Sequence, residues 1–368
     1  MTISTIDLPV SSQSSPTSTT IMKALVYHGP GKKDWENKPR PTILQPEDAI
    51  LRITTTTLCG TDLHILKGDL PQVIDGRILG HEGIGVIEEL GSAVTEFKVG
   101  DKVIISCVTA CLKCDFCRQG KYSHCRNGGW ILGYTLDGTQ AEYVRIPYAD
   151  GSLYSFPKNG IEESLVMLSD ILPTGFECGV LNGKVQPGDT VAIVGAGPVG
   201  LSVLLTAQFY SPARIIMIDL DENRLNVAKE FGATDLINSA KGDAVEQLMK
   251  LTGNAGVDVA IEAVGLPATF KICQSILAVG GRLANVGVHG KSVELDMEKL
   301  WDHNIALTTR LVDTSTTPML LKVVESGKLE PSKLVTHHFA LHDIINAYET
   351  FGNAAKEHAL KVVLTTSE

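Results

Sequence analysis

Four of the eight cysteines lie close together, in the pattern C-x2-C-x2-C-x7-C. They are Cys111, Cys114, Cys117 and Cys125. Four thiolates complete the tetrahedral shell that Zn²⁺ prefers and leave no position open for a substrate, so the spacing predicts a structural zinc site. Two alternatives remain open: a pair of disulfides, which a reducing compartment disfavours, and an iron–sulfur cluster, which the seven-residue gap disfavours.

Two further zinc-binding residue types lie far apart in the chain. Cys59 in LCGTDLH and His81 in GHEG each stand at the end of a β-rich segment bounded by glycine, a placement that can direct a side chain into a cleft. Either residue alone also has a purely structural explanation, as a small buried thiol or a hydrogen-bonded imidazole. The remaining cysteines, Cys107, Cys178 and Cys273, are expected to be buried packing residues.

A glycine-rich motif, GAGPVG, follows the apolar segment TVAIV and opens a helical pattern. Its candidate cofactor-binding residues are Gly195, Gly197, Pro198, Val199 and Gly200. The first glycine permits a tight turn, the second lets the backbone approach a pyrophosphate, and the third allows close packing of helix on strand. This pattern predicts a dinucleotide site.

The next apolar segment, RIIMID, ends at Asp219, nineteen residues after Gly200. A carboxylate there can bind both ribose hydroxyls of the adenosine and would repel a 2′-phosphate, so the sequence favours NAD over NADP. Arg224 lies five residues further on and could bind the ribose or partly offset the carboxylate. Gly287 and Val288, in the turn after GRLANV, are placed where a nicotinamide ring is expected to rest.

The elements that must position these residues fall into two groups. From about position 187, six apolar segments alternate with helical patterns: TVAIVG, RIIMID, TDLINS, VDVAIEAVG, GRLANVGV and IALTTRLV. This alternation predicts a doubly wound parallel sheet of the Rossmann type, with IALTTRLV as an edge strand. Segments before position 157 are short, β-rich and interrupted by Gly and Pro, which predicts an antiparallel β-rich domain.

After Val312 the chain shows helical patterns and a single final strand, LKVVLT, which we expect to return to the first domain. The predicted fold class is therefore a two-domain α/β protein. A catalytic domain comprises residues 22–170 and 313–368, and a dinucleotide-binding domain comprises residues 171–312. Residues 1–21, rich in Ser and Thr, are expected to form a disordered tail.

Composition excludes several classes of protein. The 368 residues are 43% hydrophobic and 20% charged, and the net charge of −10 makes a nucleic-acid partner improbable. The longest uncharged stretch, 190–213, is divided by glycines and a proline, so we expect no membrane segment. The N-terminus resembles neither a secretory nor a mitochondrial signal, which predicts a cytoplasmic protein with reduced cysteines.

Together, CGTDLH, GHEGIGVIEELG, the four-cysteine loop, TGF, VAIVGAGPVG and IMID resemble the zinc-containing medium-chain alcohol dehydrogenases, in the order which that family shows. The match extends from about Met22 to Thr366. It implies a GroES-like catalytic domain beside the Rossmann domain, two Zn²⁺ per subunit, one catalytic and one structural, and NAD. It further implies a small alcohol or carbonyl substrate and a homo-oligomer, with a tetramer favoured.

The resemblance also assigns roles to individual residues. Cys59, His81 and Asp170 would bind the catalytic zinc, with Asp170 where many members have Cys, and Glu82 is a nearby acid that can approach the metal. Thr61 and His64 correspond to the proton relay. Candidate cofactor contacts are Thr174, Val264, Val286 to Val288, and Lys361, the last with the pyrophosphate.

Asp at the third ligand position is similar to the secondary-alcohol dehydrogenases of anaerobic and thermophilic bacteria. That branch typically lacks the four structural cysteines and uses NADP, so this chain combines features of two branches. We expect reversible hydride transfer between an alcohol, preferably secondary, and NAD. The alternatives are a polyol or diol dehydrogenase and, in a different class, a zinc-free quinone reductase or a non-catalytic dinucleotide binder.

Overall fold

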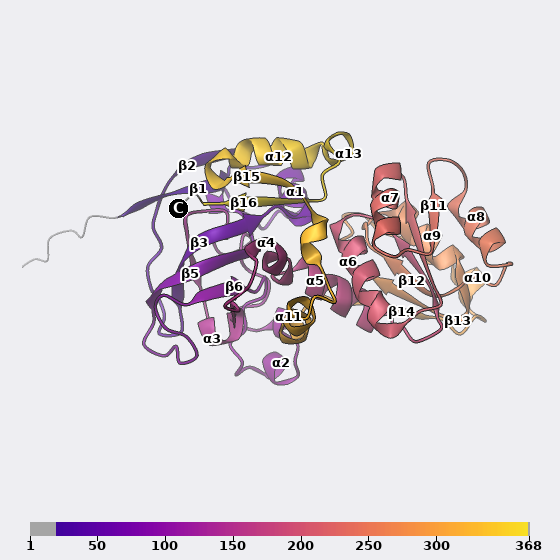
Figure 1. Ribbon diagram of the computed structural model, residues 1–368, viewed down its shortest axis with the longest axis horizontal. Coiled ribbons are helices and arrows are strands. Elements are labelled where there is room, and N and C mark those ends of the chain that lie inside the picture. The colour runs from indigo at the N-terminus through magenta and orange to yellow at the C-terminus, as the bar shows by residue number, and fades with distance from the viewer. Residues whose placement is uncertain (1–19, 367–368) are drawn as a thin grey trace, which may run out of the picture.

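Two lobes, each built on its own sheets, make up the computed structural model, which describes residues 20–366 (Figure 1). Most of the predicted tail, residues 1–19, lies outside the described residues. The first strand begins at Ile21, where the Ser- and Thr-rich segment ends and an alternating apolar pattern begins.

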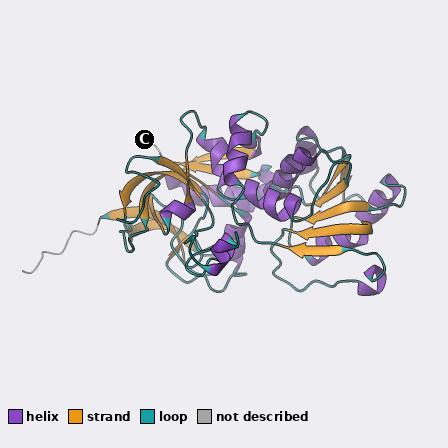
Figure 2. Cartoon of the chain, turned by 90° about the horizontal axis from the view of Figure 1, so that it is seen from below, coloured by secondary structure: helices purple, strands orange, loops and turns teal. Residues whose placement is uncertain are grey.

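The second lobe contains a six-stranded parallel sheet, as the alternating pattern predicted. Its strands are β9 (Thr190–Val194), β10 (Arg214–Asp219), β11 (Asp235–Asn238), β12 (Val257–Glu262), β13 (Leu277–Asn285) and β14 (Ala306–Thr309). The spatial order β11-β10-β9-β12-β13-β14 is the doubly wound order, and β14 is an edge strand, as expected. Figure 2 shows these strands as one layer at the end of the molecule away from the first lobe.

Helices alternate with these strands along the chain. They are α6 (Pro198–Ala207), α7 (Glu222–Glu230), α8 (Ala244–Leu251), α9 (Pro267–Ser275) and the short α10 (Met297–Leu300). Strands such as β9, which is buried on both faces, carry the continuous Val and Ile runs typical of a sheet covered by helices.

The first lobe is mainly antiparallel. Its strands are β1 (Ile21–Tyr27), β2 (Lys33–Pro39), β3 (Ala49–Thr57), β4 (Arg77–Ile78), β5 (Gly83–Leu90), β6 (Lys102–Ile105), β7 (Tyr143–Ile146), β8 (Leu153–Ser155), β15 (Val335–Ala340) and β16 (Lys361–Thr365). One sheet has the order β2-β1-β4, and the other has the order β15-β16-β3-β5-β6-β8, with β7 paired to β3.

The C-terminal segment returns to the first lobe, as predicted, but it contributes two strands rather than one. β16 pairs with β3 in antiparallel fashion and with β15 in parallel, so β15 is the strand that sequence reasoning missed. Figure 1 shows the yellow C-terminal elements beside the indigo N-terminal strands. The short helices of this lobe are α1 (Gly60–Lys67), α2 (Asp115–Arg118), α3 (Ala149–Ser152), α4 (Glu162–Leu165), α5 (Ile171–Thr174), α11 (Thr317–Glu325), α12 (Ile344–Gly352) and α13 (Ala354–Glu357).

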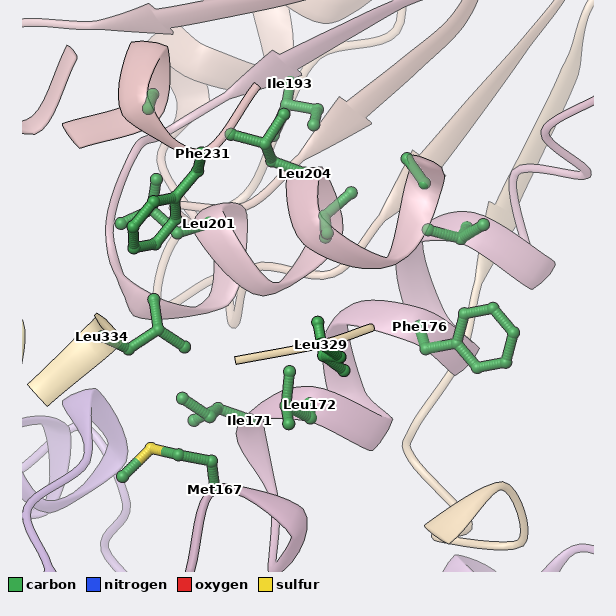
Figure 3. Packing of buried hydrophobic residues seen from close by; sticks show 14 of the residues in the cluster. Met167, Ile171, Leu172, Phe176, Ile193, Leu201, Leu204, Phe231, Leu329 and Leu334 are labelled. Atoms are coloured by element: carbon green, nitrogen blue, oxygen red, sulfur yellow. The ribbon is translucent and has the colours of Figure 1, made fainter. Parts of the chain in front are cut away.

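The largest hydrophobic cluster joins the two lobes. Helix α5 continues into a π-helical segment, Gly175–Leu181, and both pack against α6 of the second lobe. Ile171, Leu172 and Phe176 lie in the same cluster as Leu201 and Leu204 of α6 (Figure 3). This junction holds the residue just before α5, Asp170, in a fixed place between the lobes.

Among residues 20–366, no single helix has the length and apolar composition to cross a membrane. One bent pair, Glu162–Leu168 with Ile171–Leu181, meets the criteria only when its two parts are combined.

Candidate active site

The structure brings Cys59, His81 and Asp170 together from three separate elements. Cys59 is the N-cap of α1 directly after β3, His81 lies in the turn between β4 and β5, and Asp170 immediately precedes α5. Their ligand atoms all lie within 4.8 Å of one another. His81 Nε2 is 3.1 Å and Cys59 Sγ is 4.0 Å from Asp170 Oδ2.

These separations fit a zinc ion. Ligand distances of 2.0 to 2.3 Å in a tetrahedron place neighbouring ligand atoms about 3.3 to 3.8 Å apart. One thiolate, one imidazole and one carboxylate are ligand types that Zn²⁺ accepts, and three protein ligands leave a fourth position for a substrate oxygen. The set therefore has the composition of a catalytic site rather than of a structural one.

A buried carboxylate, Asp62, supports two of these ligands. Only 1% of the residue is exposed, one of its oxygens accepts the Cys59 backbone N–H at 2.9 Å, and the other is 3.9 Å from His81 Nδ1. Burial raises the pKa of Asp62. At 3.9 Å the second oxygen is beyond hydrogen-bond distance of His81 and has no hydrogen-bond partner within the described residues, so Asp62 fixes the Cys59 backbone and places a negative charge near the imidazole.

Glu82 lies behind the ligand cluster and is not part of it. Its Oε2 is bound by the Thr57 hydroxyl and by Lys361 Nζ, while Oε1 has no hydrogen-bond partner within the described residues. The Lys361 ammonium group therefore holds one oxygen of the Glu82 carboxylate, and in the described part of the chain the other oxygen is left without a hydrogen bond.

Lys361, the predicted pyrophosphate contact, forms an ion pair with Glu82. The side chain is buried, and Nζ donates to Thr57 Oγ1 at 2.8 Å, to the Leu58 carbonyl at 3.0 Å and to Glu82. A buried carboxylate requires a nearby cation, and Lys361 supplies it. The residue also lines a cavity that contains Gly197 and Pro198 of the glycine-rich turn, so the pyrophosphate contact stays a prediction.

Thr61 and His64 lie three residues apart on α1, so they share one face of the helix. Thr61 Oγ1 is 3.7 Å from Cys59 Sγ. His64 Nδ1 is 2.8 Å from Asp69 Oδ2, and 31% of the His64 side chain is exposed to solvent. Thr174 donates a hydrogen bond to the other oxygen of Asp170, which fixes the carboxylate.

A cavity of about 380 Å³ opens at this cluster. Its predicted lining residues are Cys59, Thr61, His64, Asp170, Thr174, Val199, Val264, Val286, Gly287 and Val288. Sequence reasoning missed Leu70, Trp130, Ala263, Arg310, Leu311 and Val312, and it assigned Cys178 to packing alone. The walls are mostly apolar, and they come from both lobes and from the segment after β14.

A second cavity, of about 240 Å³, shares Cys59, Gly60, Val199 and Ala263 with the first and reaches the glycine-rich turn. Gly197 is the N-cap of α6 and Pro198 occupies its first turn, which leaves backbone N–H groups free at the helix start. A Cβ on Gly200 would lie 1.8 Å from the Gly195 carbonyl oxygen, whereas one on Gly197 would meet only Arg224 Nη1 at 3.8 Å. Gly200 is thus required for packing, and Gly197 borders open space.

Asp219 ends β10 beside this turn. Its carboxylate accepts the backbone N–H groups of Ala196 at 2.6 Å and Asp221 at 2.9 Å, which fixes its orientation. Arg224 on α7 lines the second cavity, and its Nε is 4.0 Å from Asp221 Oδ2. Both residues therefore face the place where the adenosine ribose of a dinucleotide is expected.

The four clustered cysteines form a separate group, with sulfur atoms within 4.8 Å of one another. Backbone N–H groups of Cys111 and Cys117 point at Cys125 and Cys114 sulfurs, and Asn127 Nδ2 lies 3.4 Å from Cys111 Sγ. Burial alone would raise the pKa of the Cys111 thiol, but the Lys113 backbone N–H and Asn127 lower it to about 6. No disulfide joins any of the eight cysteines, all of which the structure describes, so the four sulfur atoms of the loop are available as ligands and do not form the alternative pair of disulfides.

The segment after β14 connects this cysteine loop to the cavity. Asp313 accepts the Ser123 backbone N–H at 3.0 Å and its hydroxyl at 2.7 Å, and it binds Arg310 Nη2 at 2.9 Å. Buried Glu177 accepts the Asp313 backbone N–H at 2.8 Å. Because these residues are polar and distant in sequence, no local pattern identified them.

Comparisons with known proteins agree with this geometry. A family model described as an alcohol dehydrogenase GroES-like domain matches residues 45–158, and one described as a zinc-binding dehydrogenase matches residues 198–326. An alcohol dehydrogenase from Cupriavidus necator is 38% identical over 366 residues, covering 94% of this chain and 99% of that protein. Sorbitol dehydrogenase from Bacillus subtilis is 31% identical over 350 residues, covering 93% and 97%.

Among solved structures, the apo form of zinc dependent alcohol dehydrogenase 2 from Streptococcus pneumonia superposes with a TM-score of 0.91 at 56% sequence identity. The match covers 94% of this chain and 99% of that one. Family models, relatives and structural neighbours thus agree over most of the chain. The chain belongs to the zinc-containing medium-chain alcohol dehydrogenase family and is an oxidoreductase.

Proposed function

We propose that this protein is an NAD-dependent dehydrogenase that interconverts small secondary alcohols and ketones. The observation that carries the proposal is the cavity in which Cys59, His81 and Asp170 meet residues of the second lobe, since it places a metal-binding set beside a dinucleotide turn.

Zinc held by Cys59, His81 and Asp170 would lower the pKa of an alcohol hydroxyl, and the nicotinamide would accept the hydride. The Thr61 hydroxyl, close to Cys59 Sγ, can accept the alcohol proton while it passes its own proton on through the cofactor ribose. The partly exposed His64 imidazole can take up that proton and release it to solvent. Apolar walls exclude water from the reacting carbon. Asp62 and Thr174 keep the ligands oriented.

Asp219 supports NAD as the cofactor. Its carboxylate is fixed by two backbone N–H groups at the ribose end of the site. It can therefore accept hydrogen bonds from the ribose hydroxyls of NAD, and its negative charge would repel the 2′-phosphate of NADP. Arg224 faces the same space, so comparing the kinetics with NADH and NADPH also measures its effect on cofactor choice.

The apolar cavity supports a simple alcohol over a polyol. Leu70, Val286, Val288 and Leu311 are among the lining side chains, and they offer no hydrogen bonds to additional hydroxyl groups. Because the chain is also similar to a sorbitol dehydrogenase, the experiment below tests polyol and diol substrates as well.

We also propose two zinc ions per chain, the second held by Cys111, Cys114, Cys117 and Cys125, and a cytoplasmic homo-oligomer, a tetramer. Exposed apolar side chains in and between β13 and β14 support a subunit interface: Val279, Met297, Trp301 and Leu307.

Steady-state kinetics of the zinc-loaded protein test the proposal. We expect 2-propanol to have a higher kcat/KM than 2,3-butanediol or sorbitol. The kcat/KM for NADH should exceed that for NADPH by at least about tenfold, because the 2′-phosphate of NADPH would lie near the Asp219 carboxylate. A preference for the polyols would favour the alternative, and a preference for NADPH would contradict the role of Asp219.

The same assay tests the metal set through Asp170→Ala. We expect one zinc per chain to be lost and kcat/KM to fall by on the order of a thousandfold, because stabilising the reacting oxygen is worth several kcal/mol. Asp75→Ala is the control, since this side chain is 78% exposed, pairs with His28 and lines neither cavity. Unchanged metal content and turnover in Asp170→Ala would overturn the ligand assignment.

A further inference from the structure

Two turns that line the cavity interlock at backbone contact distance. One follows β12 and contains Val264 and Gly265, and the other follows β13 and contains Gly287 and Val288. A Cβ on Gly265 would lie 2.2 Å from the Val288 carbonyl oxygen, and one on Gly287 would lie 2.2 Å from the Gly265 nitrogen. Neither turn can therefore shift without the other.

A single buried residue, Glu262, holds both turns. Its carboxylate accepts the backbone N–H of Val264 at 3.0 Å and that of Gly265 at 2.9 Å. Its own carbonyl oxygen accepts the N–H groups of Val286 at 2.8 Å and Gly287 at 3.1 Å. The residue has no exposed surface, so these bonds are formed away from water, where each contributes most to positioning.

Three side chains complete the arrangement around Glu262. The Thr269 hydroxyl donates to its carboxylate at 2.6 Å, and Asn285 Nδ2 donates to the Gly287 carbonyl at 2.9 Å. His289 Nε2 is 2.8 Å from Asn285 Oδ1 and 3.4 Å from Glu262 Oε2. Since both neighbours are acceptors, His289 Nε2 must carry the hydrogen. The hydrogen of Nε2 thus points toward Asn285 and Glu262, while His289 Nδ1 has no hydrogen-bond partner within the described residues.

We propose that Glu262 is a positioning residue that sets the nicotinamide pocket, with Thr269, Asn285 and His289 as its supports. None of the four lines the cavity, whereas the turns that they hold do. The proposal rests on the proposed function, because it assigns the pocket between the turns to the nicotinamide ring of a dinucleotide.

Glu262→Gln tests the proposal with little change in shape. The glutamine oxygen can keep the Oε1 position, which accepts the Val264, Gly265 and Thr269 donors. The amide N–H₂ then takes the Oε2 position, where it meets the Gly265 N–H at 3.1 Å and His289 Nε2 at 3.4 Å, so an accepted hydrogen bond is replaced with a repulsive contact. Binding of NADH and of ADP-ribose is measured by calorimetry on the full, zinc-loaded chain. ADP-ribose lacks only the nicotinamide, so it reports the rest of the dinucleotide site.

We expect Glu262→Gln to weaken NADH binding by about tenfold, the effect of losing one well-formed buried hydrogen bond. ADP-ribose binding should weaken by less than about twofold, because the lost bond affects only the pocket for the nicotinamide ring. Hydride transfer in single turnover should slow in parallel. Thr269→Val removes one donor to the same carboxylate and should weaken NADH binding by a smaller factor. This second variant tests the proposal even if Glu262→Gln folds poorly.

Asp48→Asn is the matched control. Asp48 is likewise buried and accepts two backbone N–H groups, those of Leu44 and Gln45, but it lies in the first lobe away from the cavity. Its variant should leave both affinities unchanged. Equal loss of NADH and ADP-ribose in Glu262→Gln, or no loss of either, would overturn the positioning role. A wild-type chain that binds neither ligand would overturn the proposed function and this inference with it.

Discussion

Lys361 places a positive charge in the interior of the first lobe, where 1% of the residue is exposed. Burial alone would lower the pKa of Lys361, but the charge of Glu82 raises it above its ordinary value of 10.5. The folded state therefore gains stability from the charged lysine at every pH below 10.5, and it loses that contribution only as the pH rises through the higher folded value.

Lys361→Met should lower the free energy of unfolding by about 3 kcal/mol, because it leaves the Glu82 carboxylate buried without its cation. The double variant Glu82→Gln/Lys361→Met should recover more than half of the loss. Urea denaturation at neutral pH measures both, with Lys356→Met, at an 85% exposed side chain, as the control. Equal stability of Lys361→Met and the wild type would contradict the structural importance of the ion pair.

At the scale of elements, regular apolar patterns predicted the parallel sheet well, since β9, β10 and β12 are short runs of Val, Ile and Ala ended by glycine-rich or acidic turns. β15 was missed because VTHHFA carries two histidines and depends on pairing with β16. Local propensity cannot report such a partner.

The candidate site was predictable to a different degree for each residue. The spacing of the four cysteines and of the glycine-rich turn is local and therefore visible in the sequence. Asp170 lies 111 positions from Cys59, and only resemblance to a family suggested it. Trp130 and Arg310 reach the cavity from loops whose course depends on the packed fold. Residue type alone does not distinguish them from other surface or packing residues.

The turn between β9 and α6 gives a paired prediction. Gly200→Ala should reduce the free energy of unfolding by about 2 kcal/mol or more, since its Cβ would overlap the Gly195 carbonyl oxygen. Gly197→Ala meets no nearby backbone, so stability should stay within about 0.5 kcal/mol while NADH affinity falls at least about tenfold. Thermal unfolding and calorimetric titration measure the two effects. Loss of stability in Gly197→Ala would show that the turn is packed rather than open.

At the scale of the whole molecule, the cysteine loop is tied to the junction of the lobes. Ser123, two residues before Cys125, is bound by Asp313, and Asp313 is bound by Arg310 at the cavity wall. Order in the loop therefore supports the segment by which the chain leaves the second lobe and returns to the first.

Cys117→Ser should reduce the zinc content from two ions per chain to one and lower Tm by roughly 5 °C or more, because structural zinc contributes directly to folding. The kcat/KM at 25 °C should remain within about tenfold of the wild type. Elemental analysis and calorimetry check this. Cys273→Ser, at an equally buried thiol outside the loop, should lose stability while retaining both ions. Full zinc content in Cys117→Ser would contradict the second metal site.

The position of β16 determines when the first lobe can be completed during synthesis. It lies between β15 and β3, and its first residue provides the cation for Glu82, yet it follows the whole of the second lobe in the chain. The second lobe is continuous in sequence from β9 to β14, so its sheet can form while synthesis proceeds. The ligand-bearing lobe must wait for β16, because β7 pairs only with residues 49–52 of β3 and β16 pairs with residues 55–57.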